Sequence, residues 1–129
     1  MKTGSWTTVG PVRGRIGISL GSPRRQAAGY RLYRPLAPAG DMLRMSYEGY
    51  YPRYQEILAA LDPQKVWDEV HALAGVDGQG RQIEPILLCF EVPPWSENNW
   101  CHRRMAAKYL EGALGVSIPE LGFEDDSNV

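Results

Sequence analysis

A short apolar run that ends beside chemically reactive side chains most constrains how this chain can fold. Residues 85–91 read Pro-Ile-Leu-Leu-Cys-Phe-Glu, and such a continuous apolar run is typical of a central strand buried on both faces. A helix is expected from about residue 99 or 100 to residue 114, with Gly115 as its C-cap. It opens with Cys101, His102 and Arg103. Both cysteines therefore meet at one strand-to-helix junction, where open α/β folds bind ligands.

The rest of the chain alternates predicted strands and helices. A first strand is predicted over 15–20, and a long Gly- and Pro-containing connection follows it. Apolar residues spaced as on one helix face predict two helices, the first with its apolar face from Tyr50 to Leu61 and with Pro52 in its first turn. The second begins after Asp62 as N-cap. With a last strand over 116–118, the pattern predicts α/β architecture: a largely parallel sheet of three to four strands flanked by about three helices.

Length and composition favour a single compact domain. The chain has 129 residues, of which 43% are hydrophobic, and two domains of half this length would each bury little apolar surface. We expect a flexible N-terminal segment over 1–14, a single α/β domain over 15–121 and an acidic C-terminal tail over 122–129. The net charge of −1 gives no general attraction to nucleic acid or membrane.

The distribution of charge is less even than the net value. The first 40 residues contain six arginines, one lysine and no acidic residue. This asymmetry indicates either a basic surface that binds anions or arginines that pair with acids brought close by folding.

Cysteine usage and the absence of long apolar stretches indicate a cytoplasmic protein. Two cysteines are too few for a secreted disulfide scaffold, and no signal-like or membrane-spanning run is present in the sequence. We therefore expect reduced thiols and no membrane partner. A disulfide between Cys89 and Cys101 is geometrically feasible but disfavoured in that compartment.

Helical geometry predicts which side chains of the third helix face the sheet. With the apolar face centred on Ala106, a rotation of about 100° per residue turns His102 and Arg103 inward and Arg104 toward water. An inward-facing cation needs a partner. Glu91, just beyond the strand, is one candidate, and an anion bound at the helix N-terminus is the other.

Residues that follow the first strand would reach the same edge of a parallel sheet. This places Ser19 and Arg24 near the junction, and one tyrosine hydroxyl, that of Tyr54, could border the pocket. The predicted ligand-binding residues are Arg103, Glu91, Cys89, Ser19, Arg24 and Tyr54.

The candidate catalytic residues are Cys101 and His102. A helix N-terminus, an adjacent imidazole and nearby arginines each lower a thiol pKa, which suits Cys101 as a nucleophile with His102 as an acid or base. The alternative is a buried inert cysteine beside a satisfied imidazole. A zinc site at Cys89, Cys101 and His102 lacks the usual ligand spacing, so we expect no metal and no cofactor.

The junction residues resemble those of the domain-of-unknown-function 488 family, a group of small bacterial, archaeal and phage proteins. The resemblance covers about residues 15–121. Its marks are Leu87-Leu88-Cys89-Phe90-Glu91, Cys101-His102-Arg103 with Ala106, Leu36-Ala37-Pro38, Tyr51 with Tyr54, and Pro119-Glu120-Leu121. The resemblance implies an α/β fold with the Cys-His-Arg cluster at the sheet edge, and no established reaction.

Together these features predict a protein that binds an anionic ligand, such as a phosphate, a nucleotide or a nucleic-acid backbone, at the junction. Arg103 would hold the anion, and Glu91 would orient Arg103. One alternative is an enzyme that uses Cys101 or His102 on that ligand. Another is an interaction module in which the cluster is structural. Open sheet edges would also allow a homodimer.

Overall fold

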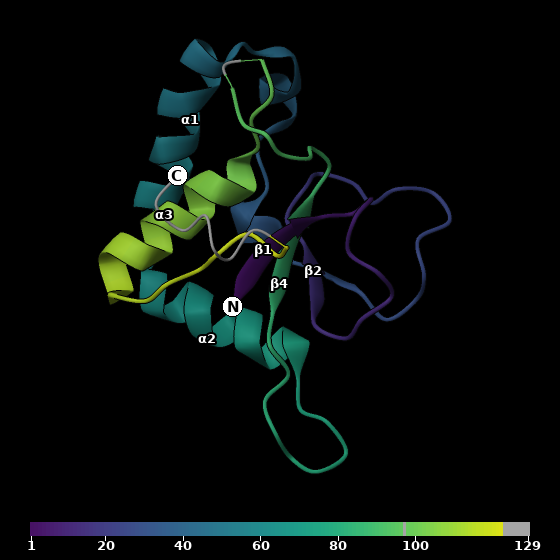
Figure 1. Ribbon diagram of the computed structural model, residues 1–129. Coiled ribbons are helices and arrows are strands. Elements are labelled where there is room, and N and C mark those ends of the chain that lie inside the picture. Colours follow the sequence, from purple (N-terminus) through teal and green to yellow (C-terminus); the bar gives the residue numbers. More distant parts are fainter. Residues whose placement is uncertain (97, 123–129) are drawn as a thin grey trace.

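The protein is built on a small parallel β-sheet. The computed structural model describes residues 1–96 and 98–122. Within them the strands β1 (Lys2–Ser5), β2 (Arg15–Gly17), β3 (Arg31–Leu32) and β4 (Ile86–Cys89) lie in the order β1-β4-β2-β3. Each neighbouring pair is parallel, as the ribbon in Figure 1 shows for the central strands. The predicted single-domain α/β architecture is confirmed.

Three helices follow the predicted segments, with end signals at two of them. These helices are α1 (Tyr47–Ala59), α2 (Pro63–Ala74) and α3 (His102–Leu114), and two short 3-10 turns, η1 (Arg34–Leu36) and η2 (Gly40–Arg44), precede them. The Asp62 carboxylate accepts from the first-turn amides of α2, and Gly115 ends α3 at a left-handed φ of 68°. Helix α1 begins earlier than predicted, so Pro52 lies inside the helix and not in its first turn.

The sheet separates two apolar layers of unequal size. The helices pack together on one face over Ile16, Ile18 and Leu87, and Figure 1 shows all three grouped on that side. The other face is covered by the N-terminal loop, where Trp6 packs with Ile86 and Leu88. Because side chains alternate along a strand, Cys89 shares the helix-facing side of β4 with Leu87.

The structure differs from the sequence prediction at both ends of the chain. Residues 2–5, expected in a flexible segment, form β1 and pair with β4 over their whole length. Their sequence, Lys-Thr-Gly-Ser, has no apolar pattern that would predict a strand. The strand is stabilised instead by backbone pairing with β4 and by burial inside the fold. The strand predicted over 116–118 is absent. The returning chain instead makes one isolated parallel bridge, between Glu120 and Thr3.

The acidic tail expected over 122–129 lies outside the described residues except for Gly122. In the described part of the chain, none of the helices has the length and apolar character needed to span a bilayer.

Candidate cysteine site at the strand-to-helix junction

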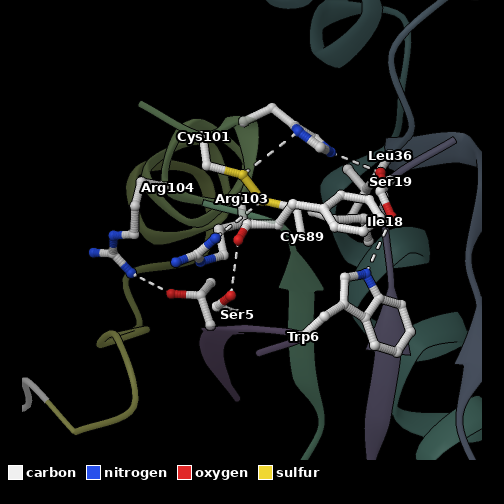
Figure 2. Close-up of a disulfide and its surroundings, with 12 residues drawn as sticks. Ser5, Trp6, Ile18, Ser19, Leu36, Cys89, Cys101, Arg103 and Arg104 are labelled. Atoms are coloured by element: carbon white, nitrogen blue, oxygen red, sulfur yellow. Dashed lines mark hydrogen bonds between the residues drawn. A yellow bond between two sulfur atoms is a disulfide. The ribbon is translucent and has the colours of Figure 1, made fainter. Parts of the chain in front are cut away.

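Cys89 and Cys101 are joined by a disulfide bond. Cys89 is the last residue of β4 and Cys101 is the N-cap of α3, with Cα atoms 7.0 Å apart. The side chains are almost fully buried, at 1% and 4% exposure. Figure 2 shows the bond crossing from the strand end to the helix start. The expectation of two free thiols is therefore wrong for this structure, because the fold brings the sulfur atoms within bonding distance.

Arg103 lies beside the disulfide with no exposed surface. Its Nη1 donates to Cys89 Sγ at 3.1 Å, while Nε and Nη2 donate to the two carboxylate oxygens of Glu120 at 3.0 and 2.7 Å. The guanidinium also stacks on the Trp95 ring, 4.8 Å from its centroid. The bidentate contact with the Glu120 carboxylate thus holds the Arg103 guanidinium against the sulfur of Cys89.

The partner predicted for Arg103 was wrong. Glu91 is exposed, and the carboxylate that pairs with Arg103 belongs to Glu120, 17 residues away in sequence. The chain turns back after α3 and places Glu120 next to β1, where the Thr3 hydroxyl donates to it at 2.6 Å. That return path is a long-range feature that local spacing around Arg103 does not encode.

Arg104 also differs from its predicted position. It was expected to face water, but it is half-buried, and its Nη1 donates to Thr3 Oγ1 at 2.9 Å and to the Ile118 carbonyl at 2.7 Å. The two neighbouring arginines therefore both serve the contact between α3, β1 and the returning chain. Figure 2 shows Arg103 toward the disulfide and Arg104 on the outer side.

His102 faces inward, as predicted, and its tautomer follows from its contacts. Nε2 lies 2.6 Å from the Ile18 carbonyl oxygen, which can only accept, so Nε2 carries a proton. Burial lowers the pKa of His102 to about 4, so the ring is neutral at pH 7. The unprotonated Nδ1 is therefore the nitrogen that lies 3.8 Å from Cys101 Sγ.

The two cysteines border two different cavities. One, of about 470 Å³, opens at the carboxyl ends of β2 and β4, and its lining includes Cys89, His102, Ser19 and Glu91. The other, of about 910 Å³, is lined by Cys101 and by aromatic and charged residues of α1, α3 and the preceding loop. The two cysteines thus line cavities on different sides of the junction.

The remaining predicted site residues lie in different surroundings. The Ser19 hydroxyl accepts from Trp6 Nε1 at 3.2 Å and donates to the Gly21 carbonyl at 2.5 Å, at the wall of the smaller cavity. Tyr54 is a core residue whose hydroxyl donates to the Leu36 carbonyl at 2.7 Å. Arg24 is exposed and lines neither cavity.

Sequence reasoning missed Glu120, Thr3 and Trp95 as parts of the site. For Glu120 a signal existed, since Pro119-Glu120-Leu121 is one of the marks of the family resemblance. No sequence signal identifies Thr3 or Trp95, because neither residue falls in a strand or helix that the sequence pattern predicts.

The cluster offers two kinds of chemistry. Two adjacent cysteines support dithiol–disulfide exchange. Two sulfurs and an imidazole nitrogen are also donors for soft metal ions. Among the described residues, Cys89, Cys101 and His102 form a group whose ligand atoms all lie within 4.8 Å of one another.

Comparison with known proteins adds no relative from which a role could be taken. No protein-family model matches the chain, and no similar protein was found among curated proteins or solved structures.

Proposed function

We propose that this protein carries out dithiol–disulfide exchange, with Cys89 and Cys101 as the redox pair. The observation that supports the proposal is the bonded pair itself, with a guanidinium on Cys89 Sγ and an imidazole nitrogen facing Cys101 Sγ. Positive charge and a nearby base both favour a thiolate. A purely structural disulfide needs neither group.

Cys101 is the residue that attacks the substrate disulfide. It borders the larger cavity, whereas Cys89 borders the smaller one and its sulfur is in contact with Arg103. As N-cap of α3, Cys101 is also next to the unpaired amides and the positive end of the helix dipole. The lone pair of His102 Nδ1 is placed to take the thiol proton.

The exchange proceeds in two balanced steps. The Cys101 thiolate attacks a substrate disulfide, forms a mixed disulfide and releases one substrate thiolate. The Cys89 thiolate, stabilised by Arg103, then attacks the Cys101 sulfur and releases the second substrate thiolate. The protein ends as the disulfide and two electrons have passed to the substrate.

A cytoplasmic location, which we also propose, fits this chemistry. Disulfides in that compartment are usually transient and serve catalysis or redox sensing. We further propose kinship with the domain-of-unknown-function 488 family, because the residues that carry that resemblance, Cys89, Cys101, His102, Arg103 and Glu120, are those that meet at the site.

Binding of an anionic ligand is a second candidate function, at a site other than Arg103. Arg103 already has Glu120 as its counter-charge. Two other cations of α3, Arg104 and Lys108, line the larger cavity together with exposed tyrosines of α1. A ligand with a negative group and an aromatic ring would suit such a wall. The homodimer stays a prediction that size measurement would test.

A redox titration with paired cysteine variants tests the exchange proposal. We expect the full chain, equilibrated in glutathione buffers with a metal chelator, to show a reversible potential between about −270 and −120 mV, the range of redox-active pairs. Cys89→Ser should accumulate a mixed disulfide with glutathione on Cys101, detected by intact mass, and Cys101→Ser should accumulate much less. A potential below about −300 mV would identify a structural bond and refute the proposal.

A further inference from the structure

We infer that the reduced form of this site binds one zinc ion through Cys89 Sγ, Cys101 Sγ and His102 Nδ1. The inference goes beyond the exchange chemistry, since it needs only that the disulfide can be reduced. Two thiolates and one imidazole are a donor set that zinc uses in sites with an open fourth position. Loading releases two thiol protons and changes no oxidation state.

One pair of donor atoms, Cys101 Sγ and His102 Nδ1, already has the separation of two ligands on a tetrahedral zinc ion. Zinc bonds of about 2.3 Å to sulfur and about 2.05 Å to nitrogen place the two atoms about 3.6 Å apart at a tetrahedral angle. The distance from Cys101 Sγ to His102 Nδ1 is 3.8 Å. On reduction the two sulfurs would have to move about 1.7 Å farther apart to share the ion. All three donor atoms lie within 4.8 Å of one another.

His102 is oriented in the manner of a metal ligand. Its Nε2–H donates to the Ile18 carbonyl, which fixes the ring and points the lone pair of Nδ1 toward Cys101. Ligating histidines generally donate their second ring N–H to a carbonyl or carboxylate in this way. The carbonyl of Ile18, the residue that follows β2, therefore leaves Nδ1 as the ring nitrogen that is free to bind a metal ion.

The surrounding charges compensate a buried zinc–dithiolate. Two thiolates balance the dication, and Glu120 balances Arg103, so the complete cluster carries no net charge. The Arg103 Nη1–H that now contacts Cys89 Sγ would donate to a zinc-bound thiolate, an outer contact of the kind that holds ligands in place.

The fourth position opens on the smaller cavity. Cys89 and His102 both line that cavity of about 470 Å³, along with the hydroxyl-bearing Ser19. A water molecule there would complete the coordination. The two sulfur ligands favour zinc over magnesium or calcium, which bind through oxygen.

Metal titration of the reduced full chain tests the inference. The protein is reduced with a phosphine, freed of metal by a chelator that is then removed, and titrated with Co²⁺ and with Zn²⁺ against a chromophoric chelator. We expect one equivalent to bind, with sulfur-to-cobalt charge-transfer bands and the intense visible bands of four-coordinate Co²⁺. Zn²⁺ should displace the Co²⁺ and should slow alkylation of both thiols at least tenfold.

Matched variants separate the site from nonspecific binding. His102→Asn and Cys101→Ser should each weaken Zn²⁺ binding more than tenfold. His71→Asn changes the second of the two histidines, which lies on α2 and is not part of the cysteine–histidine group, and this variant should bind as the wild type does. The oxidised chain should not bind.

Three outcomes would overturn the inference. The first is reduced wild type that keeps its thermal transition but binds no Co²⁺ or Zn²⁺. The second is unchanged affinity in the His102 and Cys101 variants, and the third is equal binding by the oxidised chain. Thiol protection is measured on the wild type, so the inference stays testable if a variant fails to fold. The redox potential is measured in chelator, so failure here leaves the exchange proposal to its own test.

Discussion

The buried ion pair between Arg103 and Glu120 gives the sharpest prediction about stability. Arg103 has no exposed surface and Glu120 has 7%. The two oxygens of Glu120 accept three hydrogen bonds, two from Arg103 and one from Thr3. Changing Glu120→Gln keeps the shape but removes the charge and turns one acceptor into a donor that faces the guanidinium.

The expected cost follows from leaving a cation buried without its partner. Removal of one member of a buried pair typically destabilises a protein by about 3–5 kcal/mol. Glu84 provides the matched control, because its side chain is 53% exposed and contacts the amino groups of Met1 and Lys2 at 3.4 and 3.7 Å. Glu84→Gln should cost no more than about 1 kcal/mol.

Urea unfolding of the oxidised proteins measures both changes under one condition. We expect Glu120→Gln to lower the unfolding free energy by at least about 2 kcal/mol more than Glu84→Gln does. The double variant Arg103→Met with Glu120→Leu should recover much of the loss, because it leaves no unpaired charge. Equal effects of the two Glu→Gln changes would refute the reasoning that the pair is desolvated and mutually dependent.

Three further predictions concern a helix cap, the sheet and acid stability. Asp62→Ala should lower the unfolding free energy by about 1 kcal/mol. Asp62→Asn should lower it far less, because its amide oxygen can still accept from the first-turn N–H groups of α2. Equal decreases in the unfolding free energy of the two variants, measured in urea, would contradict this prediction. Gly17→Ala should lower the unfolding free energy by about 1–3 kcal/mol, because the added Cβ would clash with the Trp6 ring. Gly10→Ala is the control and should have little packing cost, because the space around Gly10 is open. Similar melting temperatures of the two variants would contradict the packing of Trp6 on Gly17. Folded His102 has a pKa of about 4 against 6.5 for the ordinary imidazole, so its contribution to stability should be present above pH 6.5 and fall with decreasing pH. The decline between pH 6.5 and about 5, before most carboxylates titrate, should be absent in His102→Asn, and an identical pH profile of the variant would exclude His102 as its source.

Much of the fold was predictable because its signals are local. The apolar run before Cys89 predicted a central strand, and β4 pairs with a strand on each side. Asp62 and Gly115 marked helix ends that the structure has at those residues. Strands β1 and β3 were not predictable in this way, since edge strands of two to four residues carry no apolar period and depend on pairing with β4 and β2.

The candidate site also has some features that follow from local sequence signals and others that depend on long-range packing. The sequence by itself determined that Cys89, Cys101, His102 and Arg103 would meet, because a strand end and a helix start joined by one loop must lie together. It also determined that His102 and Arg103 would face inward, since helical periodicity fixes their direction.

Only the tertiary structure decided what these side chains contact. Glu120 reaches Arg103 through the return of the chain after α3, and Thr3 reaches Glu120 across 117 residues. The Ile18 carbonyl that sets the tautomer of His102 comes from the end of another strand, 84 residues away. The physical reason is that local periodicity fixes direction along one element, whereas partners and burial depend on how separate elements pack.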